Sequence, residues 1–381
     1  MKKVVILTPS LGMGGMERVL VNYANLLVSM DYDVTVLNFT YHDEELIKSF
    51  DERVRYQSYY SPVKHLFKSS LKSILKGDFR LCSFTKWVKK HNAQYLYKKL
   101  IRDDFDVEIA FFGGITAKIV SGSTNLKAKG LVWIHSANIQ GLIDDIGSEE
   151  DFRKVYNSIE NVVCVSNEVK KRVSQLISED RLTVVHNPHD VEKVRELASE
   201  RVEMPKDRLN LINVSRLDDK SKGFIRLLDV CNRLNADGFN YNLWVVGDGP
   251  DAEKIKAYAK ELKLDNVKFL GKQSNPYKYV SAADVYVCSS YYEGFSMTMM
   301  EAIILAKPIL TTDVSGADEM LDGGKYGIIV ENSEDGIYQG IKSLLKDNML
   351  YEFYQNKAEE RKNFFDSKKA KANLEKLLCQ N

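Results

Sequence analysis

The sequence predicts an α/β fold of two doubly wound domains, each built on a parallel sheet. Short apolar runs alternate with longer segments of helical periodicity along the whole chain, which is the pattern of parallel strands and their covering helices. The chain has 381 residues, 44% of them hydrophobic, and this is enough material for two cores. A polar, charged stretch at 190–207 divides the pattern into two series.

The first domain is predicted to span residues 1–190. Its first apolar run is too short for a signal peptide and leads directly into a glycine loop, so we assign it to the first strand. A helix is expected after that loop, at 19–28. The strands of this domain are expected at 4–7, 34–37, 107–112, 131–134, 162–165 and 183–185.

The second domain is predicted to span residues 191–359. From Ser333 to its end the chain has a helical pattern. The strands of this domain are expected at 210–214, 242–246, 267–270, 285–288, 308–311 and 327–330.

Two carboxylates, Glu293 and Glu301, stand eight positions apart where a predicted strand passes into a predicted helix. Gly294 permits a tight turn, and Ser296 is a good N-cap for a helix that stops before Pro308. Backbone N–H groups at a helix N-terminus favour an anion, and carboxylates accept hydrogen bonds from hydroxyls. This combination describes a nucleotide-sugar, although two glutamates on a helix are more often a solvated face.

Two further sites add to this signal. Arg216 and Lys222 follow the predicted strand at 210–214, at the end where open parallel sheets bind ligands, and a diphosphate requires such cations. Gly14 and Gly15 lie between the first strand and the first helix, where backbone can approach a ligand closely. A glycine loop alone is weak evidence, so it is the combination that indicates nucleotide-sugar binding.

With these motifs in this order, the chain resembles the retaining nucleotide-sugar glycosyltransferases of family four, of the type that builds bacterial surface polysaccharides. The resemblance covers nearly the whole chain and implies the GT-B architecture, with two facing Rossmann-like domains, parallel sheets and a cleft between them. It also implies that a last helix, at about 360–381, packs back onto the first domain. It rests on GGMERV at 14–19, VSRL at 214–217, VGDGP at 246–250, FLG at 269–271, the segment 293–301 and the Asn187-Pro188 turn.

The resemblance implies roles for the donor-binding residues. Arg216 and Lys222 would hold the diphosphate, and Gly14 and Gly15 would approach it from the first domain. Glu301 would bind the ribose hydroxyls. Backbone near Leu270 would face the base, for which uridine is the commonest choice in the family. The sugar would contact Glu293, Gly294, Phe295, Ser296 and Met297, although Ser296 and Met297 depart from the glycine and branched aliphatic residue of many relatives.

His135 directly follows the strand expected at 131–134. A lone histidine is more often a core residue, but the resemblance implies a place near the transferred sugar. We therefore predict a catalytic set of His135, Arg216, Lys222 and Glu293.

The resemblance implies transfer of the sugar to an acceptor hydroxyl with retention of configuration. No protein nucleophile emerges, which favours a front-face reaction and leaves a two-step covalent route as the alternative. We expect no cofactor and no metal, because the Asp-x-Asp motifs at 31–33 and 104–106 each precede a predicted strand instead of following one. Protein cations would then stabilise the leaving diphosphate.

Residues 62–102 carry many cations and a single carboxylate, Asp78, before their end. Such a basic amphipathic segment is either a solvated surface helix or a docking surface for an anionic membrane. Nucleic acid is disfavoured because the segment has no recognised binding motif and the formal net charge is only +1. Its first cations recur every four residues, on one side of a helix: Lys64, Lys68, Lys72 and Lys76.

The five cysteines are odd in number and show no paired spacing, which indicates a reducing compartment. Cys164 and Cys288 lie in apolar strands and are expected in the core. No segment approaches the roughly 20 apolar residues of a membrane span. We expect a cytoplasmic protein, free or held on the inner face of the membrane, that acts on a glycan or a lipid-linked glycan.

Two alternatives stay open from the sequence. Another enzyme of the same architecture, such as an epimerase or a phosphorylase, would share the fold. A non-catalytic nucleotide-sugar-binding protein would bind the donor without transferring the sugar.

Overall fold

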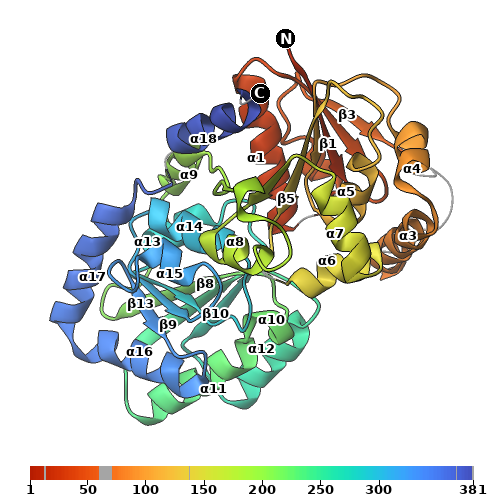
Figure 1. The fold of residues 1–381 in the computed structure, drawn as a ribbon. Coiled ribbons are helices and arrows are strands. Elements are labelled where there is room, and N and C mark those ends of the chain that lie inside the picture. The colour runs from red at the N-terminus through yellow and green to blue at the C-terminus, as the bar shows by residue number, and fades with distance from the viewer. Residues whose placement is uncertain (13, 60–70, 137, 366, 380–381) are drawn as a thin grey trace. The chain divides into compact units, whose positions relative to one another are not determined.

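The computed structural model describes residues 1–12, 14–59, 71–136, 138–365 and 367–379. The chain divides into two units, which we call unit 1 (Met1–His189 with Lys368–Asn381) and unit 2 (Asp190–Ser367). Each unit holds one parallel sheet with covering helices, as Figure 1 shows, and this confirms the predicted α/β fold.

Unit 1 is built on a seven-stranded parallel sheet of order β3-β2-β1-β4-β5-β6-β7. Its strands are β1 (Lys3–Thr8), β2 (Asp33–Asn38), β3 (Arg55–Ser58), β4 (Val107–Ala110), β5 (Lys129–Ile134), β6 (Asn161–Cys164) and β7 (Leu182–Val184). The six predicted strands are all present. The edge strand β3 was missed because its sequence, RYQS, is polar and half exposed.

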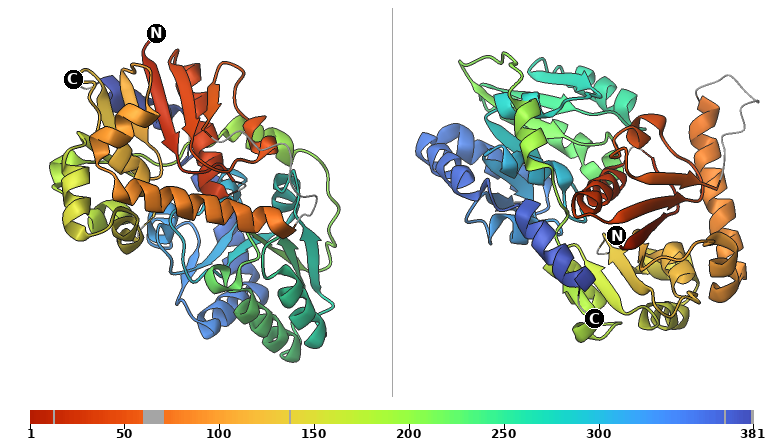
Figure 2. Two further views of the ribbon diagram at one scale, coloured as in Figure 1. Left: turned by 90° about the vertical axis from the view of Figure 1, so that its right-hand side faces the viewer. Right: turned by 90° about the horizontal axis from the view of Figure 1, so that it is seen from above.

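The helices of unit 1 cover this sheet and bury an aromatic core in which Tyr23 meets Phe111 and Trp133 edge-on, each at 5.4 Å. The first helix begins at Gly15, earlier than predicted, because the glycine loop itself forms its first turn. Figure 2 shows α3 as one long helix. The helices are α1 (Gly15–Ser29), α2 (Glu44–Ile47), α3 (Leu71–Lys90), α4 (Ala93–Leu100), α5 (Gly114–Val120), α6 (Ile139–Ile146), α7 (Glu149–Asn157), α8 (Asn167–Val173), the 3-10 turn η1 (Glu179–Arg181) and α18 (Ser367–Cys379).

Unit 2 is built on a six-stranded parallel sheet of order β10-β9-β8-β11-β12-β13. All six predicted strands are present, each within one residue of its expected limits. They are β8 (Leu209–Val214), β9 (Tyr241–Val246), β10 (Val267–Gly271), β11 (Val285–Cys288), β12 (Ile309–Thr312) and β13 (Ile328–Val330).

The helices of unit 2 form two groups, with α11 beside α12 and α16, and α9 beside α13 and α14 (Figure 1). The last helix, expected at about 360–381, is α18, and it begins later, at Ser367, while α17 ends at Arg361. The helices are α9 (Val191–Ala198), α10 (Asp219–Lys222), α11 (Phe224–Ala236), α12 (Ala252–Glu261), α13 (Tyr277–Ala282), α14 (Met297–Ile304), α15 (Ala317–Leu321), α16 (Glu334–Lys346) and α17 (Asn348–Arg361).

Both Asp-x-Asp motifs lie at the start of a strand, as predicted. Asp33 opens β2 and its carboxylate pairs with Arg55 at 2.7 Å. Asp106 precedes β4 and accepts a hydrogen bond from the backbone N–H of Lys3 at 2.7 Å. Cys164 and Cys288 are buried, as expected for core thiols. Within the described residues, none of the helices is long and apolar enough to cross a membrane.

Candidate functional site

The predicted cations of unit 2 stand on a loop that follows β8 and packs against the loop after β9. Leu217 N–H donates to the carbonyl of Asp248 at 3.1 Å, and Asp251 N–H donates to the carbonyl of Leu217 at 3.0 Å. Gly247 has a φ of 143°, and a Cβ there would lie 1.9 Å from the carbonyl oxygen of Ser215. The glycines of the VGDGP motif therefore allow the two loops to touch, which places the backbone around Arg216.

Lys222 and Glu293 meet at this edge of the sheet although they lie far apart in sequence. Lys222 Nζ donates to Glu293 Oε1 at 2.7 Å, and the two side chains are 21% and 10% exposed. Ser290 Oγ donates to the same oxygen at 2.6 Å. Within the described residues no hydrogen bond reaches Glu293 Oε2. Two N–H groups of Lys222 and one carboxylate oxygen therefore stay available for a ligand.

A buried arginine, Arg226, binds the backbone next to the pair of Lys222 and Glu293. Arg226 is 6% exposed and donates to the carbonyls of Ser289 and Ser290 at 2.6 and 2.8 Å. Its guanidinium also stacks on Tyr291, 3.7 Å from the ring centroid. Because Ser290 is itself a partner of Glu293, Arg226 helps to hold that carboxylate in place.

The helix α14 begins as predicted. Ser296 is its N-cap, and its Oγ accepts from the N–H of Met299 at 3.4 Å. Glu301 lies on this helix and is buried at 7% exposure, where its Oε1 accepts from Tyr277 OH at 3.1 Å. Tyr277 of α13 therefore orients the side chain of Glu301, the residue that was predicted to bind the ribose.

Leu270 and Arg216 differ in whether other side chains of the protein already bind them. The Leu270 carbonyl accepts from Gln273 Nε2 at 2.7 Å, so a side chain already contacts the backbone that was expected to face the base. Arg216 is exposed, and within the described chain its side chain makes no hydrogen bond or ion pair. It is thus a solvated cation that can turn toward a ligand.

Gly14, Gly15 and His135 belong to unit 1. Gly14 is the N-cap residue of α1 and Gly15 is the first residue of that helix, and both are exposed. They therefore stand at a helix N-terminus, where backbone N–H groups can bind an anion, and their role as a donor site stays a prediction.

His135 follows β5 and is buried against an aromatic wall. Its ring centroid lies 4.5 Å from that of Phe111 and 6.1 Å from that of Phe112. Burial lowers the pKa of His135 to about 4. The imidazole is therefore neutral near pH 7, and in a catalytic role it could exchange hydrogen bonds but could not act as a cation.

The predicted basic segment forms α3 and α4 in its described part. Lys64 and Lys68 lie outside the described residues, as do the side chains of Lys72 and Lys76. Along the rest, Trp87 packs near His91 at 5.0 Å, and His91 stacks on the exposed Tyr95 at 4.9 Å. We call this region the α3–α4 surface; its exposed cations are Lys86, Lys89, Lys90, Lys98 and Lys99.

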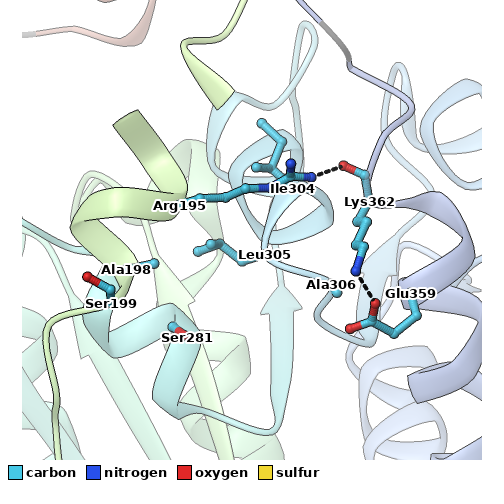
Figure 3. A pocket seen from close by; sticks show the side chains of 9 residues that line it. All are labelled: Arg195, Ala198, Ser199, Ser281, Ile304, Leu305, Ala306, Glu359 and Lys362. Carbon is cyan, nitrogen blue, oxygen red and sulfur yellow. Dashed lines mark hydrogen bonds and ion pairs between the residues drawn. The ribbon is translucent and has the colours of Figure 1, made fainter. Parts of the chain in front are cut away.

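A pocket of about 260 Å³ lies elsewhere in unit 2, as Figure 3 shows. Arg195 of α9 donates across it to the carbonyl of Lys362 at 3.4 Å, and Lys362 pairs with Glu359 at 2.5 Å. Leu305 and Ala306 line it at the C-terminal end of α14, whereas the predicted sugar-binding residues, at 293–297, stand at the N-terminal end. The pocket therefore contains none of the predicted site residues.

Within the described residues, no three His, Cys, Asp or Glu side chains gather as a metal site. Sequence reasoning missed Ser290, Tyr277 and Arg226. The best available signal was Arg226, a lone charge on the apolar face of α11. Tyr277 and Ser290 gave no signal because their contacts depend on tertiary structure.

Residues 194–362 match the family described as "Glycosyl transferases group 1". A curated relative from Campylobacter jejuni, N-acetylgalactosamine-N,N'-diacetylbacillosaminyl-diphospho-undecaprenol 4-alpha-N-acetylgalactosaminyltransferase, is 33% identical over 205 residues, which is 53% of this chain and 54% of the relative. The chain thus spans about half the length of that relative. An uncharacterized glycosyltransferase from Haemophilus influenzae is 25% identical over 358 residues, 92% of each chain.

Solved structures share the fold over the whole chain. A glycosyltransferase from Rickettsia africae has a TM-score of 0.72 and 19% identity, and covers 99% of this chain and 97% of its own. HepE from Anabaena, in complex with UDP and glucose, has a TM-score of 0.72 and 16% identity with full coverage of both chains. These similarities and the two Rossmann-like units identify the fold as GT-B.

Proposed function

We propose that this protein transfers a sugar from a nucleoside diphosphate to a hydroxyl of a glycan or lipid-linked glycan, because its residues 194–362 match the group 1 glycosyl transferases. Uridine is the favoured base, and surface-polysaccharide synthesis is the proposed setting. Retention of configuration at the sugar, independence from metal ions and a cytoplasmic location complete the proposal. The relative from Campylobacter jejuni, whose name includes a diphospho-undecaprenol substrate, supports a lipid-linked acceptor.

The pair of Lys222 and Glu293 carries this proposal. Two free N–H groups of Lys222 can bind a phosphate oxygen, and Glu293 Oε2 can accept a hydrogen bond from a sugar hydroxyl. One ligand with a phosphate beside a sugar would therefore satisfy both side chains at once. Arg216 would supply the second cation for the leaving diphosphate.

The other donor contacts follow from the same placement. Glu301, oriented by Tyr277, would accept hydrogen bonds from the ribose hydroxyls, and backbone near Leu270 would face the base. Amides of Gly294, Phe295 and Ser296 would complete the sugar site beside Met297. In unit 1, Gly14 and Gly15 would approach the diphosphate, and neutral His135 would hydrogen-bond the transferred sugar.

The direct test is a thermal-shift panel of nucleotide-sugars, followed by a transfer assay with the donor that binds. A ligand at about 100 times its dissociation constant should add about 2.7 kcal/mol of stability. Binding with neither transfer nor slow hydrolysis of the donor would favour a non-catalytic binding protein. Products of epimerisation or phosphorolysis would assign another GT-B reaction.

We also propose that the α3–α4 surface docks on an anionic membrane. Cations there can pair with lipid headgroups at about 1 kcal/mol each, and Trp and Tyr favour the interface of a bilayer. The test is co-sedimentation with anionic and neutral vesicles at low and high salt, since salt screens such binding. Matched charge reversals to Glu compare Lys86, Lys90 and Lys98 with the exposed control residues Lys254, Lys260 and Lys272. Equal partitioning of both variants would remove the membrane claim.

A further inference from the structure

The donor loop, defined as residues 293–296, is held by an aromatic ring from near the end of unit 2. Phe295 lies inside this loop and Phe365 follows α17, yet their ring centroids are 6.0 Å apart at an interplanar angle of 83°. Both side chains are 6% exposed. This edge-to-face geometry is a favourable aromatic contact.

A glycine encloses the same ring from another direction. Gly316, the N-cap of α15, has a φ of 81°, and a Cβ there would lie 2.7 Å from the ring of Phe295. The Phe295 ring therefore lies between the backbone of Gly316 and the ring of Phe365, and it can move little unless Phe365 moves as well. Because Phe295 directly precedes the N-cap Ser296, displacement of this ring would also move the backbone amides at the start of α14.

The chain around Phe365 is firmly attached to unit 2. Arg361 donates to the carbonyls of Glu319 and Met320, each at 2.9 Å, and lies 3.4 Å from the centroid of Phe364. Arg195, which lines the pocket in Figure 3, donates to Asn363 Oδ1 at 2.8 Å. Residues 361–365, which we call the return segment, thus lead from α17 to Lys368, where the chain rejoins unit 1.

We propose that Phe365 is a positioning residue that acts through Phe295 and couples the donor loop to the return segment. This inference rests on the proposed function, since it assumes that the donor loop contacts the diphosphate-sugar part of a nucleotide-sugar. A donor that orders the loop then also orders the return segment, and the coupling is reciprocal. A nucleoside lacks the phosphates and therefore does not contact the donor loop, so its binding is not coupled to the return segment.

The experiment compares Phe365→Leu with Phe353→Leu, using UDP and uridine as probes. Leucine keeps an apolar side chain in the cluster and removes the ring edge. Phe353 of α17 is the matched control because it is 49% exposed and its ring contacts Tyr354 and Lys357. Phe365→Leu should weaken UDP binding about fivefold or more and leave uridine binding unchanged, since about fivefold is the lower end of typical couplings. Phe353→Leu should leave both affinities unchanged.

Hydrogen exchange supplies a second measurement. UDP should slow exchange of the Phe364 N–H, which donates to the Arg361 carbonyl at 2.8 Å, in the wild type and not in Phe365→Leu. Equal weakening of both ligands, an equal effect of Phe353→Leu, or unchanged protection in Phe365→Leu would overturn the inference alone. Wild-type protein that binds none of UDP, GDP and ADP would overturn the proposed function. If GDP or ADP binds in place of UDP, the same comparison is made with that nucleotide and its nucleoside.

Discussion

The residues that follow the central strands differ in charge between the two units. After β8 and β11 of unit 2 stand Arg216, Lys222 and Glu293, with the last two paired at 2.7 Å. After β4 and β5 of unit 1 stand Phe111 and His135, and burial keeps the pKa of His135 at about 4. We call the residues after β8 and β11 the charged edge and those after β4 and β5 the neutral edge, because they suit a charged and an uncharged part of a ligand, respectively. This difference is the reason that the proposed function assigns the leaving diphosphate to Arg216 and Lys222.

The largest expected effect tests the charged edge. Arg216→Ala should reduce transfer by roughly a hundredfold or more, on the estimate of about 3 kcal/mol for one donor to a developing anion. The melting temperature should stay near that of the wild type, because Arg216 is exposed and unpaired within the described chain. Steady-state rates with the identified donor provide the measurement, and wild-type turnover would contradict the assignment of Arg216.

The neutral edge predicts a pH dependence of stability. The pKa of His135 is lowered in the folded protein to about 4, so the unfolded chain binds the proton first as pH falls. The histidine therefore contributes full stability above about pH 6.5 and loses about 3 kcal/mol between pH 6.5 and 4. His189, also buried with a pKa lowered to about 4, adds a similar loss.

The check is urea unfolding at several pH values for the wild type and His135→Phe. The variant should lose about one proton from the slope of stability against pH, and His189 should account for a remaining slope of similar size. A slope identical to that of the wild type would mean that His135 titrates normally and that this edge of unit 1 is not neutral.

Within unit 2, Lys222 and Arg216 should differ in how much each side chain contributes to the free energy of unfolding. Lys222→Ala leaves Glu293 without its cation at 10% exposure, so the free energy of unfolding should fall by about 1–3 kcal/mol. Arg216→Ala should not change it. Glu293→Gln in the Lys222→Ala background should restore part of the loss by removing the buried charge. If the two single variants melt alike, Lys222 and Glu293 are not coupled in solution.

The smallest expected effect is that of chelation. The sequence has no Asp-x-Asp at the carboxyl end of a strand, and the cations of unit 2 are proposed to stabilise the diphosphate, so activity should survive excess EDTA. Loss of activity in EDTA that Mg²⁺ or Mn²⁺ restores would show that the charged edge acts together with a metal ion.

The local pattern of the chain determined the α/β fold, twelve of the strands and the N-cap at Ser296, because alternating apolar runs and capping residues are local signals. The polar edge strand β3 was not predicted, because it has no apolar run and so lacks this local signal. Family motifs in order then indicated Lys222, Glu293 and Glu301 as site residues.

Only the tertiary structure decided which of these side chains meet. Lys222 and Glu293 are paired while Arg216 stays solvated, although all three have the same kind of motif signal. Tyr277 orients Glu301, and Phe365 holds Phe295, through contacts between residues far apart in sequence. Periodicity and capping report the conformation of neighbours along the chain, whereas pairing, burial and the pKa of His135 depend on which distant groups the fold brings together.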